Sequence, residues 1–267
     1  MLKSIFGKSL RDSRTSLIGW SIGMIALVAL IVAFYPAIKQ TPALNQLLSS
    51  KGGAKIFEAI RGPGGSFTSP EGYLQAEIFG LDGPLLFLIF GLIQARSLIS
   101  GEEREGTMML LLAGPKSRSQ IIIGKYVALV SQILTLGLVT WLSLLALMPL
   151  VHMSVSGVGL AAAITNMTLL VLAFATIVYG LSAWFGPRVS TTSIAAVILV
   201  ISFFLNNLAP MVQRLKLLQK FSLFYYASGN NPLVKGFGLA PFMVFGSIIV
   251  VFLAMALYGF KRRDITG

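Results

Sequence analysis

The feature that most constrains this chain is a long stretch without charge: from Tyr126 to Pro187 there is no Asp, Glu, Lys or Arg. About 20 apolar residues are enough for one helix to cross a bilayer, so this stretch is too long for a single span. Its middle, from Pro149 to Gly159, contains Pro, Ser, Gly and His, which favours a turn between two helices. The stretch therefore predicts two consecutive membrane-spanning helices.

Composition extends this prediction to the whole chain. Of the 267 residues, 55% are hydrophobic and 11% are charged, and the mean hydropathy is +0.83; soluble domains carry about 25% charged residues. These values exclude a soluble enzyme, a disordered chain and a coiled coil. We predict an all-α integral membrane protein, a single transmembrane domain over 1–267. Its six spans are expected at about 17–35, 83–100, 126–150, 160–185, 189–213 and 236–260, with an outer loop at 36–82.

The distribution of basic residues predicts the orientation of these spans. The net charge is +12, but Lys and Arg flank the apolar runs instead of forming one dense patch, so we expect no nucleic-acid partner. An even number of spans places both termini on one side. Thirteen of the 21 Lys and Arg residues then lie on that side, which the positive-inside rule assigns to the cytoplasm. We expect a multi-pass protein of the cell (plasma) membrane with cytoplasmic N- and C-termini.

The residues needed for most membrane chemistry are missing. The chain has no cysteine and one histidine, His152, which excludes thiolate and multi-histidine metal sites. Between Gly106 and Arg263 there is no Asp or Glu, so a pair of carboxylates cannot be built within the spans. The phosphate-binding pattern GxxxxGK[ST] is also absent. We therefore expect no catalytic residue, cofactor site or metal site on this chain, and a mechanical or binding function.

The loop between the second and third spans is the most informative segment. Ser100 can cap a helix over 101–113, and Glu102 and Glu103 in its first turn complement the positive end of the helix dipole. Methionines and leucines add an apolar patch, and Gly114-Pro115 ends the helix. Such a helix either lies at the lipid interface or docks into the groove of a partner protein.

A pattern in this loop resembles the membrane subunits of type-2 ATP-binding-cassette (ABC) exporters. The matching residues are Glu102-x-Arg104-Glu105-Gly106-Thr107-x-x-Leu110-Leu111-x-x-x-Pro115-x-Ser117-Arg118-x-x-Ile121-x-x-Gly124-Lys125. In that family the motif lies between the second and third spans and forms the coupling helix, which meets the ATPase subunit. The basic amphipathic segment Leu2–Thr15 looks like the family's interfacial elbow helix. The stretch Phe221–Tyr226 is similar to a Ser-Pro-aromatic element before the last span, with Leu223 in place of the proline.

This resemblance implies the permease subunit of an ATP-driven exporter of bacterial origin, without enzymatic activity of its own. The implied partners are two copies of an ABC ATPase, which would carry ATP and Mg, a second permease copy or a homologous permease, and membrane lipid. The cargo implied is a lipophilic small molecule, peptide or lipid. The residues expected to dock the ATPase are Glu102, Glu103, Arg104, Glu105, Gly106, Thr107, Met108, Leu111 and Pro115. The residues expected to line a substrate path are Phe87, Phe90, Phe203, Phe204 and Asn207.

Two other functions stay open from the residues alone. The chain could be a membrane anchor that recruits a soluble protein through the segment 102–115. It could also be a stand-alone channel or enzyme that is not coupled to an ATPase, although the spans lack the polar groups that such a function requires.

Overall fold

The computed structural model describes residues 2–39, 52, 69–209, 213–229 and 231–263. Within these residues the chain forms helices and no strand, and six helical stretches are long and apolar enough to cross a membrane. The expected all-α membrane fold is thus confirmed. The six spans are α2 (Arg14–Lys39), α5 to α7 (Pro70–Arg104), α9 with η3 (Arg118–Val151), α10 with η4 (Gly157–Arg188), α11 (Thr191–Leu208) and α14 (Leu239–Arg262).

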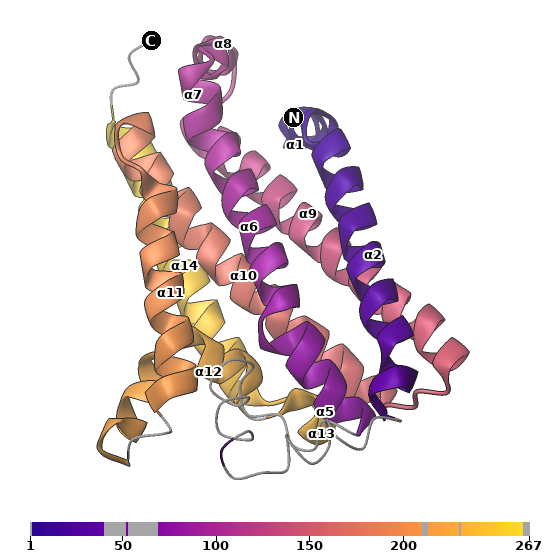
Figure 1. Ribbon diagram of the computed structural model, residues 1–267. Coiled ribbons are helices and arrows are strands. Elements are labelled where there is room, and N and C mark those ends of the chain that lie inside the picture. Colours follow the sequence, from indigo (N-terminus) through magenta and orange to yellow (C-terminus); the bar gives the residue numbers. More distant parts are fainter. Residues whose placement is uncertain (1, 40–51, 53–68, 210–212, 230, 264–267) are drawn as a thin grey trace.

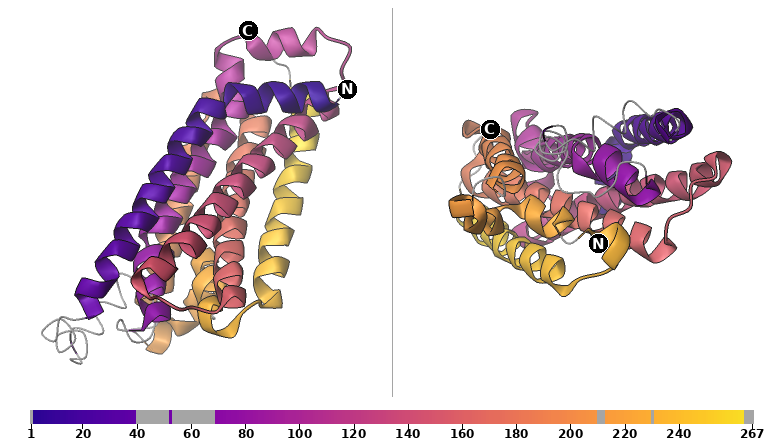
Figure 2. Two further views of the ribbon diagram at one scale, coloured as in Figure 1. Left: turned by 90° about the vertical axis from the view of Figure 1, so that its right-hand side faces the viewer. Right: turned by 60° about the horizontal axis from the view of Figure 1, so that its bottom comes forward.

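Helix α1 (Leu2–Asp12) lies across the end of the bundle at which α14 ends, and it packs against α9 (Figures 1 and 2). We call this end, where α1 begins and α14 ends, the terminal end. Ile5 of α1 is buried against the bundle and Lys8 is exposed, so the helix has an apolar and a basic face. Its last turn joins α2 through a bond that the Ser13 hydroxyl donates to the carbonyl of Ser9. This is the position expected of an interfacial elbow helix.

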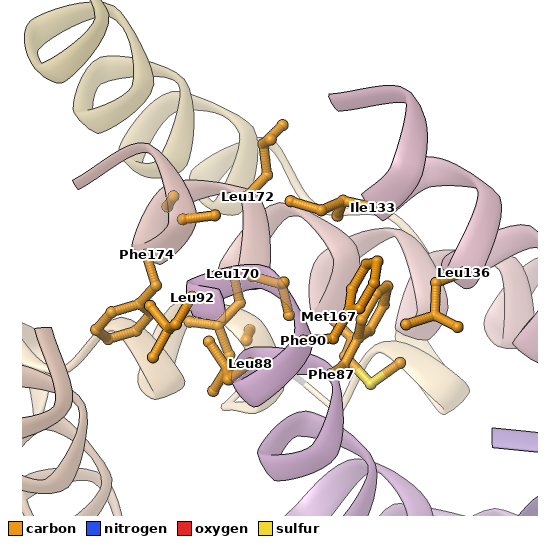
Figure 3. Packing of buried hydrophobic residues seen from close by; sticks show 14 of the residues in the cluster. Phe87, Leu88, Phe90, Leu92, Ile133, Leu136, Met167, Leu170, Leu172 and Phe174 are labelled. Carbon is orange, nitrogen blue, oxygen red and sulfur yellow. The ribbon is translucent and has the colours of Figure 1, made fainter. Parts of the chain in front are cut away.

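Helix α10 (Gly157–Phe185) lies at the centre of the bundle and packs against α6, α9, α11 and α14. Small residues allow these close approaches, as is usual for helices packed in a membrane. A Cβ atom placed on Gly180 would lie 2.6 Å from the carbonyl oxygen of Phe252 in α14. A Cβ atom on Gly91 of α6 would lie 2.7 Å from a methyl group of Val171 in α10. Figure 3 shows the apolar side chains that α6, α9 and α10 bury between them.

The second span begins earlier than the sequence predicts. Hydropathy places its start at residue 83, but the helix begins at Pro70, where the Ser69 side chain accepts a bond from the amide of Gly72. Residues 70–81 carry two carboxylates, yet this part is held inside the bundle because the Tyr73 hydroxyl donates to the carbonyl of Ile31. The segments of this span are α5 (Pro70–Leu74), η1 (Gln75–Gly80), α6 (Asp82–Arg96), η2 (Ser97–Gly101) and α7 (Glu102–Arg104).

Other boundaries also differ from the expected ones. The third span begins at Arg118 instead of residue 126, so Lys125 lies within it. Helix α11 ends at Leu208, whereas the sequence predicts the end of this span at residue 213. Residues 210–212, between the two positions, are outside the described part. Of the predicted outer loop 36–82, residues 40–51 and 53–68 are also outside it.

Short helices cover the end of the bundle opposite to α1. They are η6 (Gln213–Phe221), α12 (Leu223–Ser228) and α13 (Pro232–Lys235). Ser222 ties this layer to α11, because its hydroxyl donates to the carbonyl of Ser202 at 2.6 Å. The amide of Leu223 in turn donates to the Ser202 hydroxyl at 2.8 Å. The layer is therefore fixed to a span by hydrogen bonds at the start of α12.

Candidate functional site

Helix α7, the last segment of the second span, is followed by α8 (Thr107–Leu112) in the connection to the third span. They lie at the terminal end, and both views show α8 farther from the bundle than α1 (Figures 1 and 2). If α1 marks the membrane interface, α8 lies in the aqueous layer beyond it. The connection therefore extends beyond the end of the membrane domain.

The single helix predicted over 101–113 is wrong in one respect, because it is broken at Gly106. This residue has a left-handed backbone, φ 71°, which glycine adopts without steric penalty. Its amide donates to the carbonyl of Glu103, and the Thr107 hydroxyl donates to the carbonyl of Glu102. These bonds close the turn, so α8 changes direction relative to α7 (Figure 2).

The charged residues of α7 turn inward, toward the same chain. Glu102 forms an ion pair with Lys125 of α9 at 2.6 Å and lies 4.0 Å from Lys8 of α1. Glu103 pairs with Arg263, just beyond α14, and its side chain is 6% exposed. These two glutamates were expected to contact an ATPase, but their carboxylates are occupied within the chain.

The remaining expected docking residues divide into a buried and an exposed group. Arg104 is exposed and donates to the carbonyl of Pro187 at 3.0 Å. Met108 is completely buried, and Thr107 and Leu111 are partly buried. Glu105, Gly106 and Pro115 are exposed, as Arg104 is.

The largest apolar exposure of α8 falls on two residues that were not in the expected docking set. Leu110 is 77% exposed and Met109 is 47% exposed. We call these two residues, Met109 and Leu110, the α8 face. The sequence shows both residues in the apolar run after Gly106. Which residues of that run face outward depends on the turn at Gly106, and the sequence alone does not predict this turn.

Comparison with protein-family models gives one match over residues 3–265, described as an ABC-2 family transporter protein. This chain belongs to the ABC-2 transporter family. It is therefore a multi-pass permease subunit of an ABC transporter, a class of membrane subunit that is generally not catalytic itself and associates with an ABC ATPase. A search of curated proteins found none that matches this permease.

Two basic residues of the loop motif, Arg118 and Lys125, were not among the expected docking residues, and they hold the α7 region of the permease in place. The Arg118 guanidinium, in the first turn of α9, donates to the carbonyls of Phe260 at 3.1 Å and Arg263 at 2.7 Å. Lys125 is completely buried and also donates to the carbonyl of Leu98 at 2.8 Å. An ionisable residue inside an apolar helix is itself a signal of function, and Lys125 carries that signal in the sequence.

The five residues expected to line a substrate path do not lie together in this permease. Phe87 and Phe90 are completely buried in the core, on the side of α6 toward Met167 and Leu136 (Figure 3). The other three lie on the opposite-end half of α11. Phe203 packs edge-on against Phe224, and Asn207 accepts a bond from the Asn206 side chain. Phe204 is exposed on the surface of α11.

Several cavities lie beside the helices of the permease, and two of them differ in polarity. One, of about 310 Å³, is an apolar groove between α9 and α10, with Leu134, Leu138 and Trp141 on one wall. The other, of about 440 Å³, is a polar cleft between α1 and the α6–α8 region, with Lys8, Asp12 and Glu105 on its walls. None of the five expected path residues lines either cavity. Within the described residues, no group of three His, Cys, Asp or Glu side chains could hold a metal ion.

Proposed function

We propose that this permease docks a separate ATPase subunit through the α8 face, and that ATP-driven closure of that subunit drives export of a lipophilic small molecule, peptide or lipid. The proposed complex contains two ATPase copies and two permeases, either identical or homologous. In this proposal ATP and Mg are bound by the ATPase. The terminal end of the permease faces the cytoplasm, where the ATPase is.

The exposure of Leu110 is the observation that carries this proposal. A leucine with 77% exposure beside a half-exposed methionine would contact water at the position of α8. Exposed apolar side chains mark interaction sites, and a few side chains buried at the centre of an interface supply most of its binding free energy. The ion pairs of Glu102 and Glu103 with basic residues of this chain support the same proposal. They hold α7, which leads into α8, while Met109 and Leu110 stay exposed.

The test measures binding of the ATPase to the permease in lipid nanodiscs. Leu110→Glu should weaken binding about 30-fold, since a central apolar anchor contributes roughly 2 kcal/mol. Val234→Glu is the matched control, because Val234 is 65% exposed in α13 at the opposite end of the molecule. Equal affinity of wild type and Leu110→Glu would exclude the α8 face as the docking site. Failure of any ATPase to co-purify with the wild-type chain would favour the membrane anchor instead.

A further inference from the structure

The ion pair between Lys125 and Glu102 joins two spans at their terminal ends. Lys125 is completely buried, and its ammonium group lies 2.6 Å from the Glu102 carboxylate and 2.8 Å from the carbonyl oxygen of Leu98. Leu98 lies in η2, a π-helical segment, and such interruptions of a helix occur frequently at functional sites. The lysine therefore contacts the second span on both sides of the point where α7 begins.

Stability alone is a weak reason for this arrangement. Removing two charges from water is unfavourable, and replacing a buried ion pair by apolar residues of similar size is often neutral or stabilising. A buried pair does, however, fix which groups meet, because each charge left alone would be strongly unfavourable. The pair thus holds α7 at one position along α9 and prevents it from sliding.

A second pair, on the neighbouring residue, joins α7 to the other side of the bundle. Glu103 pairs with Arg263, and the Arg263 guanidinium also donates to the carbonyl of Ser182 near the end of α10. The carbonyl of Arg263 accepts from Arg118 of α9. Through these bonds α7 is attached to α9, α10 and the end of α14, whereas Met109 and Leu110 of α8 are 47% and 77% exposed.

We propose that Lys125 is a positioning residue that transmits displacement of α8 into α9, and that Arg263 does the same toward α10 and α14. This inference rests on the proposed docking of an ATPase at α8. It divides the loop into two functions: the α8 face receives the movement of the partner, and the two glutamates of α7 pass it on to separate spans. Glu102 and Glu103 are then transmission residues instead of docking residues.

The test is hydrogen–deuterium exchange of the permease–ATPase complex in nanodiscs, without nucleotide and with ATP plus vanadate. In the wild type, nucleotide should change exchange both in α8 and in the first turns of α9. In Lys125→Met the change in α8 should persist and the change in α9 should be lost. Lys235→Met, which removes an exposed ammonium group at the opposite end, is the control and should behave as the wild type.

A double variant separates transmission from stability. Lys125→Met alone leaves the largely buried Glu102 with only the more distant Lys8, 4.0 Å away, and lowers the thermal midpoint. Lys125→Met with Glu102→Gln removes both charges and should restore that midpoint. If the pair transmits movement, the double variant still lacks the nucleotide-dependent change in α9. A wild-type response of α9 in the double variant would overturn the inference while leaving the docking proposal intact. Absence of an ATPase from the wild-type preparation would instead overturn the docking proposal.

Discussion

Gly180 and Gly246 belong to two helices that pack against each other, yet only Gly180 is at a point of close contact. A Cβ atom on Gly180 would lie 2.6 Å from the carbonyl oxygen of Phe252, and one on Gly246 would meet no atom within 4 Å. Gly180→Ala should therefore push α10 and α14 apart and destabilise the protein by about 1–3 kcal/mol, as overpacking does. Gly246→Ala should be neutral or stabilising, because alanine favours the helix by up to about 1 kcal/mol.

Thermal unfolding in detergent, followed by tryptophan fluorescence, measures this difference. The midpoint should fall for Gly180→Ala and stay level or rise for Gly246→Ala. Both variants replace a helical glycine by alanine, and only Gly180 lies against a neighbouring helix. Equal midpoints would therefore mean that α10 and α14 do not approach each other as closely as described.

Single residues also mark where sequence reasoning ends. The acidic start of the loop was visible in the sequence, and it favoured contacts with a partner. The structure shows that Glu103 pairs with Arg263, a residue 160 positions away, and no local pattern indicates such a pair. Lys125 was within reach of prediction, since a lysine in an apolar run is unusual, but its partner depends on how α7 packs against α9.

At the scale of single elements, periodicity and charge predicted the spans but not every end. The helix start at Pro70 was missed because Glu71 and Glu77 lower the hydropathy of that segment. Tertiary contacts determine where this helix begins: Tyr73 is 1% exposed and is hydrogen-bonded to α2. The six spans themselves could be predicted because a helix in lipid must be long and apolar, wherever it packs.

The turn between α7 and α8 depends on one glycine, and this gives a prediction for the element. Gly106→Ala meets no steric obstacle, since no atom lies within 4 Å of its Cβ position, so its effect comes from the backbone alone. A left-handed conformation is unfavourable for alanine by about 1–2 kcal/mol. Gly106→Ala should therefore weaken ATPase binding in nanodiscs about tenfold, as α8 leaves its orientation.

Gly106→Asn is the matched variant for this element. Asparagine adopts the left-handed region more readily than alanine does, so its affinity for the ATPase should lie closer to that of the wild type. If the alanine and asparagine variants bind equally, the direction of α8 is not set by the conformation of residue 106.

At the scale of the whole molecule, the two ends of the bundle differ in charge. Helix α1, the first turn of α2, the α7–α9 connection, Arg188 and the end of α14 together hold most of the basic residues, at the terminal end. The positive-inside rule favours the cytoplasm for this end. The α8 face lies at the same end, so a cytoplasmic ATPase can reach it only if the terminal end faces the cytoplasm.

The orientation can be tested directly because the chain contains no cysteine. In intact cells, a membrane-impermeant thiol reagent should label Val234→Cys in α13 and should label Ala113→Cys, at the end of α8, only after permeabilisation. Both residues are exposed, so access from one side of the membrane is the difference between them. Labelling of Ala113→Cys in intact cells would place α8 outside, where no ATP-binding partner could reach it, and would exclude export driven through this helix.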